Sequence, residues 1–190
     1  MKNFVITALS LCLSVSVVVS GCKREQELTR FYPLPDFSLI DQTNRTVTLA
    51  DLENKVWVAD FIFTNCGGTC PMMTDKMRKL QDTVPKEIRL VSFTVDPGRD
   101  TPKALAVYAA EHGASADRWL FLTGDKQSLY ELCMNGFKLP VDDSGGTATE
   151  PITHSTRFVL VDKRGEIRGY YSGTEEEDLK RLASDAKKLL

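Results

Sequence analysis

The fold is decided by one stretch, residues 56–71, which reads VWVADFIFTNCGGTCP. Its first eight residues are apolar except for one aspartate and predict a buried strand, and the residues after Pro71 have the apolar spacing of a helix. Cys66 and Cys70 therefore lie at a strand-to-helix turn. We expect the free N–H groups and the positive end of the helix dipole to favour the thiolate, which is the nucleophile and the soft metal ligand.

Three uses of this thiol pair remain open: metal binding, redox exchange and a structural disulfide in an exported domain. Three intervening residues let the sulfurs either converge on a metal ion or close a disulfide, so the spacing does not decide between these uses. A structural disulfide alone would leave the adjacent Gly67-Gly68 pair without an explanation.

The first 22 residues predict export. Lys2 precedes an apolar stretch, residues 4–19, that is short and rich in serine for a membrane span. It ends in VSGC, residues 19–22, which is similar to a bacterial lipobox. We expect a lipoprotein signal peptide at residues 1–21 and a lipidated Cys22 on the extracytoplasmic face of a bacterial membrane, periplasmic if the host has an outer membrane. An ordinary signal peptide with a chance cysteine is the alternative.

About 168 residues follow Cys22, enough for one domain with a substantial core. The polar residues 22–32 predict an anchor and tether, and residues 33–190 the folded domain. Removing Lys2 changes the formal net charge of the whole chain from -2 to -3, and lysines and arginines are dispersed, which argues against a nucleic-acid partner.

Only three thiols remain once Cys12 leaves with the signal peptide and Cys22 is lipidated: Cys66, Cys70 and Cys133. Cys133 lies on an apolar helical face and is predicted to be a buried free cysteine. The methionines that follow Cys70 at helical spacing are predicted to belong to the core, not to a copper site.

Apolar runs alternate with helical patterns beyond the tether. The predicted strands are residues 36–40, 45–49, 56–63, 88–95, 119–122, 158–162 and 167–171, and the predicted helices are 72–83, 101–112, 126–135 and a last one capped by Thr174. A βαβ core followed by a hairpin and a closing helix predicts a single α/β, thioredoxin-like domain: a central mixed sheet flanked by helices, with an N-terminal strand extension.

Three segments carry a family resemblance: residues 63–71 (FTNCGGTCP), 95–102 (VDPGRDTP) and 153–162 (THSTRFVLVD). In this order they resemble the Sco/SenC family of copper-binding, thioredoxin-fold proteins that help to assemble cytochrome c oxidase. The resemblance covers nearly all of residues 33–190. It implies that Cys66, Cys70 and His154 bind copper.

The residue types agree with this implication. Two thiolates select Cu(I), and a third, imidazole ligand makes Cu(II) acceptable, whereas zinc would want a fourth ligand that the sequence does not offer. His154 stands where thioredoxin-type oxidoreductases commonly carry a cis-proline, and the nearest proline here is Pro151. His112, at a helix exit, is predicted to be a capping or surface residue.

Asp96 ends a strand and is a candidate to face the cysteine loop, where it would support a metal ligand or dock a partner. A structural interpretation of this segment is equally good, with Asp100 or Thr101 at the N-cap of the next helix. Many family members have a proline after the first cysteine, whereas Gly67-Gly68 should make this loop more mobile.

Two functions are therefore expected to compete. The first is a membrane-anchored metallochaperone that delivers copper to, or prepares the thiols of, the copper-site subunit of cytochrome c oxidase or another copper or thiol protein. The second is an extracytoplasmic thiol-disulfide oxidoreductase that uses Cys66 and Cys70 as a redox pair without a copper role. A lipoprotein with a purely structural disulfide is a third reading. A peroxidase is disfavoured, because Ala59 and Phe63 occupy positions where peroxiredoxins need proline and threonine.

Overall fold

The computed structural model describes residues 27–68, 70–145 and 152–190. The predicted signal peptide, Cys12, Cys22 and Pro151 lie outside the described residues.

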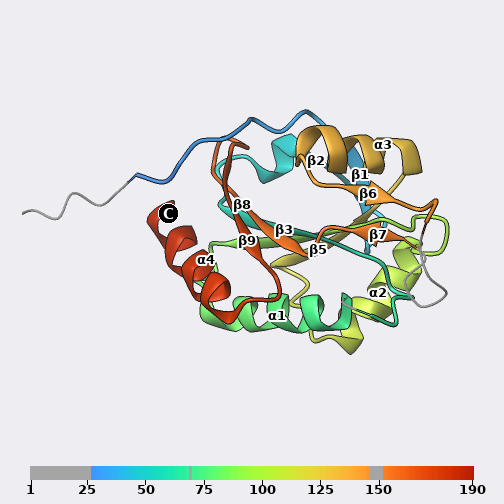
Figure 1. Ribbon diagram of the computed structural model, residues 1–190. Helices are drawn as coiled ribbons and strands as arrows, with labels where there is room; N and C mark the ends of the chain where they lie inside the picture. Colours follow the sequence, from blue (N-terminus) through green and yellow to red (C-terminus); the bar gives the residue numbers. More distant parts are fainter. Residues whose placement is uncertain (1–26, 69, 146–151) are drawn as a thin grey trace, which may run out of the picture.

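A seven-stranded mixed sheet forms the middle layer, in the order β2-β1-β5-β4-β3-β8-β9 (Figure 1). The three central strands β3, β4 and β5 are parallel, and the remaining pairings are antiparallel. Every residue of β3 is buried, as the apolar run in the sequence predicts. The strands are β1 Ser38–Asp41, β2 Thr46–Thr48, β3 Trp57–Ile62, β4 Arg89–Thr94, β5 Trp119–Thr123, β8 Arg157–Val161 and β9 Ile167–Ser172.

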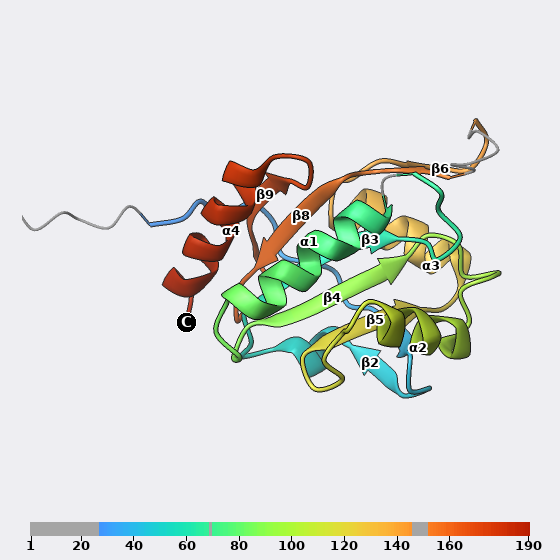
Figure 2. The ribbon, with the colours of Figure 1, turned by 90° about the horizontal axis from the view of Figure 1, so that it is seen from below.

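Helices cover both faces of the sheet. On one face lie α1 (Cys70–Thr83), α2 (Pro102–Glu111) and α4 (Glu176–Lys188), and Figure 2 shows them in front of the strands. On the other face lies α3 (Lys126–Glu131), which continues as the π-helical turn η2 (Leu132–Gly136). A short 3-10 helix, η1 (Leu49–Leu52), follows β2. The layers confirm the predicted thioredoxin-like domain.

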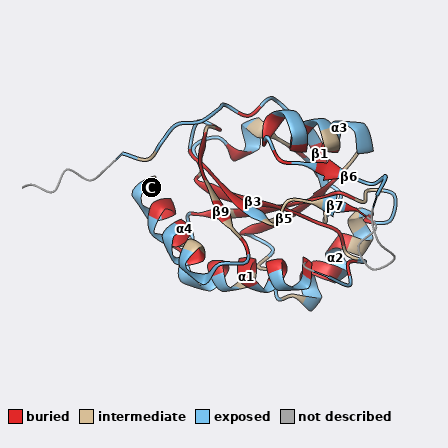
Figure 3. Ribbon diagram, viewed as in Figure 1, coloured by how far each residue is buried: buried red, intermediate tan, exposed pale blue. Residues whose placement is uncertain are grey.

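Two apolar clusters fill the spaces between these layers, and Figure 3 shows buried residues along the sheet and on the inner faces of the helices. Alternate residues of β3 serve the two clusters, because successive side chains of a strand point to opposite faces. Val58 and Ile62 pack with α1, α2 and α4, whereas Trp57 and Phe61 pack with α3 and η2. The predicted core positions Met73 and Met77 are fully buried.

Several predicted boundaries differ from the structure. The first helix begins at Cys70 itself, and the helix predicted over residues 126–135 leaves the α form after Glu131. Thr101 caps α2, as one of the two predicted alternatives, but Glu175 instead of Thr174 occupies the N-cap of α4. A small antiparallel ladder of β6 (Val141–Asp142) and β7 (Thr153–His154) was not predicted, because two-residue strands carry no hydrophobic period.

The described part of the predicted tether is hydrogen-bonded to the domain. The Phe31 N–H donates to the carbonyl of Ile167 at 2.9 Å, and the Ile167 N–H donates to the carbonyl of Tyr32 at 2.8 Å. The Arg168 guanidinium donates to the carbonyls of Leu28 and Thr29 at 2.6 and 3.0 Å. Residues 27–32 therefore lie along the start of β9.

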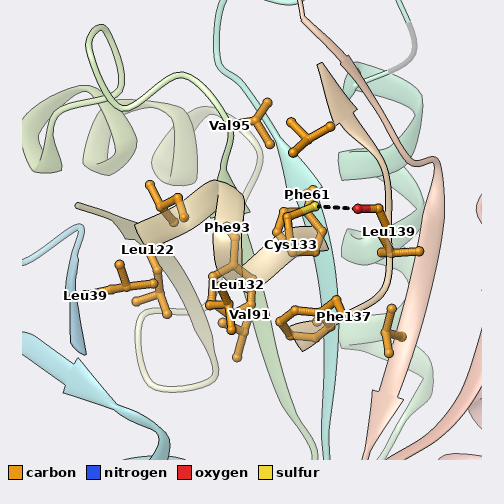
Figure 4. Close-up of a cluster of buried hydrophobic side chains, with 14 of the residues drawn as sticks. Leu39, Phe61, Val91, Phe93, Val95, Leu122, Leu132, Cys133, Phe137 and Leu139 are labelled. Atoms are coloured by element: carbon orange, nitrogen blue, oxygen red, sulfur yellow. Dashed lines mark hydrogen bonds between the residues drawn. The ribbon is translucent and has the colours of Figure 1, made fainter. Parts of the chain in front are cut away.

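Cys133 is a buried free cysteine, as predicted (Figure 4). Its side chain is fully buried among apolar neighbours such as Phe61, and its thiol donates to the carbonyl of Leu139 at 3.5 Å. Burial raises the pKa of Cys133 to about 12, so the thiol stays protonated and unreactive at neutral pH.

Candidate metal centre

The two remaining cysteines flank the turn between β3 and α1. Cys66 lies in the loop after β3, and Cys70 is the first residue of α1. Both are free thiols in this structure and both are buried, with exposed fractions of 9% and 0%. The intervening Gly67 and Gly68 are exposed. The predicted strand-to-helix position is confirmed, and the thiols are buried while the glycines between them are exposed.

His154 reaches Cys70 from the β6–β7 ladder. Its Nε2 lies 3.3 Å from the Cys70 sulfur, and its Nδ1 lies 3.1 Å from the carbonyl oxygen of Ser155. Because a carbonyl oxygen only accepts, Nδ1 donates, and Nε2 has its lone pair for the thiol. The imidazole also packs edge-on against Phe63, with 5.7 Å between ring centroids. The Ser155 carbonyl and the Phe63 ring therefore orient the imidazole with Nε2 toward the Cys70 sulfur.

The pKa of Cys70 is raised above that of an ordinary thiol. Burial is the main cause, a hydrogen bond with the Cys66 thiol adds to it, and the negative charge of Asp60 contributes further. The expectation that the start of the helix favours the thiolate is wrong for Cys70. Burial of the sulfur outweighs the helix dipole, which acts only over the first turn.

The types of side chain at this site, two thiols and an imidazole, suit a soft metal ion. Two thiols and one imidazole are the ligands that copper prefers, and Cys70 and His154 are already adjacent. In the described part of the chain, however, no three side chains of His, Cys, Asp or Glu are grouped closely enough to hold a metal ion as they stand. Cys70 contacts both Cys66 and His154, so a metal site would require the three side chains to converge further around one point.

Asp60 is a buried carboxyl that the sequence analysis did not single out. It stands in the middle of β3, opposite Ser92 of β4, and is completely shielded from solvent. By geometry neither carboxyl oxygen has a hydrogen-bond partner among the described residues. The neighbouring Ser92 hydroxyl accepts from the Trp119 indole N–H at 2.9 Å. Burial raises the pKa of Asp60 to about 7. In the sequence, Asp60 could have been noticed as the one charged residue in an otherwise apolar strand.

The second motif contributes a different aspartate from the one considered first. The Asp96 N–H donates to the Thr94 hydroxyl at 3.0 Å, and the Asp96 carboxylate pairs with Arg99 at 3.3 Å. The carboxylate that reaches the cysteine loop belongs to Asp100, which accepts hydrogen bonds from the N–H and the hydroxyl of Thr64. Burial raises the pKa of Asp100, and these donors oppose the rise.

His112 has the predicted capping role. It occupies the C-cap of α2, and its ring packs against Tyr108 with 4.3 Å between centroids. Its Nδ1 lies 3.8 Å from a carboxylate oxygen of Asp75. It thus provides a natural control for His154.

Comparisons with known proteins agree on one family. A family model described as SCO1/SenC matches residues 26–190. The SCO1 protein homolog of Bacillus subtilis (strain 168) is 38% identical over 160 residues, which are 82% of either chain. A SCO1/SenC family lipoprotein from Bacillus anthracis str. Ames is 31% identical, with a TM-score of 0.79 over 86% of this chain and 99% of that one.

Two further structures bear on copper and on the thiols. BsSco is 35% identical, with a TM-score of 0.75 over 86% of this chain and 96% of that one. A disulfide switch was identified in BsSco, which is a member of the Sco family of cytochrome c oxidase assembly proteins. ScoI of Bradyrhizobium japonicum, solved with copper bound, is 20% identical with a TM-score of 0.70 over 84% of this chain and 100% of that one, a likeness of fold. None of the helices in the described residues combines the length and apolar character that a bilayer crossing needs.

Proposed function

The chain belongs to the SCO1/SenC family, and on that premise we propose that it is a membrane-anchored copper-binding protein that delivers copper to, or prepares the thiols of, the copper site of cytochrome c oxidase. The observation that carries this proposal is the 3.3 Å contact between His154 Nε2 and the Cys70 sulfur. It joins a nitrogen lone pair to one member of the thiol pair, as a copper ligand set would require.

Copper is the cargo of this proposed site, with Cys66, Cys70 and His154 as its ligands. Cys70 and His154 are positioned by α1 and by the β6–β7 ladder, and Cys66 completes the set by a rearrangement of its loop. Gly67 and Gly68 permit that rearrangement, because residues without side chains have few backbone restrictions. Structures of family members with copper bound support copper as the metal.

Because the thiols are buried, copper binding is coupled to the release of a proton. The raised pKa of Cys70 keeps its thiol protonated until a cation arrives, so binding of copper by Cys70 displaces this proton. Transfer to a partner then proceeds by stepwise ligand exchange, and the proton returns to Cys70 as the metal leaves. We therefore expect binding to weaken as the pH falls.

Thiol-disulfide exchange is the second candidate function, favoured by the free state and proximity of the two cysteines. In this reaction the dithiol gives two electrons and two protons to a target disulfide, and a Cys66–Cys70 disulfide forms. Cys66, the more exposed thiol, would attack, and the fully buried Cys70 would resolve the mixed disulfide. The disulfide switch described for the relative BsSco supports this chemistry.

The proposed localisation is the extracytoplasmic face of a bacterial membrane. We place the lipid anchor on Cys22, after a signal peptide of residues 1–21, and assign residues 22–32 to the anchor and tether and 33–190 to the Sco domain. The last part of this tether, residues 27–32, lies along β9. The lipobox-like VSGC sequence supports this assignment, and so does the description of the Bacillus anthracis relative as a lipoprotein.

A copper titration of the reduced protein under anaerobic conditions tests the proposal. We expect one equivalent to bind, and His154→Ala to weaken Cu(II) binding about 10-fold or more, by competition against a chelator. His112→Ala is the matched control and should bind as the wild type does. Equal binding by His154→Ala, or no binding by the wild type beside a readily cycled Cys66–Cys70 disulfide, would favour the oxidoreductase instead.

A further inference from the structure

We propose that Asp100 is a positioning residue of the thiol loop, which we define as residues 64–68: its buried carboxylate holds Thr64 and thereby fixes where Cys66 stands relative to Cys70. This inference rests on the proposed function for its metal readout, and it deepens that function by connecting the second sequence motif to the thiols.

The Asp100 carboxylate is available for this role because it does not cap α2. Thr101 occupies the N-cap, where its hydroxyl accepts from the N–H of Ala104 at 3.3 Å. The N–H of Asp100 donates to the carbonyl of Asp96 at 2.9 Å, which closes a turn at the end of β4. Asp100 is fully buried despite its charge, and a buried carboxylate needs hydrogen-bond donors.

Two elements supply those donors. From the thiol loop, the Thr64 hydroxyl donates to Oδ1 at 2.5 Å and the Thr64 N–H donates to Oδ2 at 3.1 Å. From the last residue of β4, the Thr94 hydroxyl donates to Oδ2 at 2.5 Å. Hydrogen bonds to a carboxylate are about twice as strong as those between neutral groups. Asp100 therefore bridges the thiol loop and the central sheet.

Asp100 contacts the thiol loop only at its first residue, Thr64. Cys66 comes two residues after Thr64, and the exposed Gly67 and Gly68 follow it with no side chains to pack. On the other side, Cys70 is fixed at the start of α1 and contacts His154. The position of the Cys66 sulfur thus depends on Thr64, and through Thr64 on Asp100.

Three variants in the full-length protein separate positioning from general stability. Asp100→Ala removes every hydrogen bond to the carboxylate, Asp100→Asn keeps an oxygen that can accept from Thr64, and Thr64→Val removes only the hydroxyl. Asp41→Ala is the matched control, because Asp41 is also a fully buried carboxylate that holds a turn, in its case between β1 and β2. Strands β5 and β4 separate β1 from β3.

Three quantities are measured for each protein: the thermal midpoint, the Cu(II) affinity with its sulfur-to-copper absorption band, and the equilibrium of the metal-free Cys66–Cys70 disulfide with glutathione. We expect Asp100→Ala to weaken Cu(II) binding about 10-fold or more, to shift the band and to change the disulfide equilibrium constant several-fold. Asp100→Asn should restore the affinity to within about 3-fold of the wild type. Asp41→Ala should lower the midpoint and leave both site readouts unchanged.

The proposal is overturned if Asp100→Ala loses thermal stability as Asp41→Ala does while the absorption band and the disulfide equilibrium stay those of the wild type. If Asp100→Ala does not fold, Thr64→Val decides: a weaker, shifted copper site supports the proposal and an unchanged one overturns it. If the wild type binds no copper, the proposed function fails, and the disulfide equilibrium alone still tests Asp100.

Discussion

Replacing Asp60 by asparagine should flatten the pH dependence of the free energy of unfolding. In the folded protein, burial raises the pKa of Asp60 from its ordinary value of 3.8 to about 7. The unfolded state therefore binds fewer protons than the folded state between these two values, so stability falls as the pH rises through this window. Above pH 7 the full cost of the buried charge is present.

The size of the effect follows from the shift. A shift from 3.8 to about 7 corresponds to about 4 kcal/mol at 1.36 kcal/mol for each unit. Between pH 5 and pH 8 the part that is lost is roughly 2 to 3 kcal/mol. The asparagine amide does not titrate, so its own burial cost is the same at every pH.

Urea unfolding of wild type and Asp60→Asn at several pH values between 5 and 8 measures this difference. We expect the stability of Asp60→Asn relative to the wild type to rise by roughly 2 to 3 kcal/mol across the range. Asp41→Asn is the control. Hydrogen bonds from Thr43 and Arg45 hold the pKa of Asp41 below its ordinary value, so the stability that this carboxylate contributes is lost only in acid and does not change between pH 5 and pH 8. Parallel stability curves for wild type and Asp60→Asn would refute the reasoning.

Two other substitutions have defined outcomes. Cys133→Ala should cost about 1 kcal/mol in urea unfolding by leaving a small cavity, and should leave copper stoichiometry unchanged; a loss of bound copper would show that Cys133 is a ligand. Gly173→Ala should cost about 2 kcal/mol or more in the same assay, because the added methyl would collide with the Met73 sulfur and with the Thr156 carbonyl; a stability equal to the wild type would show that this packing can relax.

The fold could be predicted from the sequence because its main elements are long and strongly patterned. The buried run of β3 and the apolar face of α1 define a βα unit without any tertiary information, and the turn between them contains both thiols. The β6–β7 ladder could not be predicted in this way, since pairing of Val141 with His154 joins residues that are distant in the chain. Sequence indicated which histidine to choose, but not how it reaches Cys70.

The electrostatics of the site were predicted less well, because they depend on burial. The helix start at Cys70 correctly indicated a dipole, yet the depth of the sulfur decides its pKa. The second motif was recognised, but Asp96 was the candidate chosen from it to face the cysteine loop, and Asp100 was considered only as a helix cap. Only side-chain contacts show that Asp100 accepts hydrogen bonds from Thr64, in the loop that carries Cys66, whereas Asp96 pairs with Arg99.

X-ray absorption spectroscopy of the copper-loaded protein tests most directly whether Cys66, Cys70 and His154 form one site. The account predicts a copper ion with two sulfur neighbours and one imidazole nitrogen in the wild type, one sulfur neighbour in either cysteine variant, and no imidazole signal in His154→Ala. A spectrum with only nitrogen and oxygen neighbours, or one unchanged by His154→Ala, would contradict it.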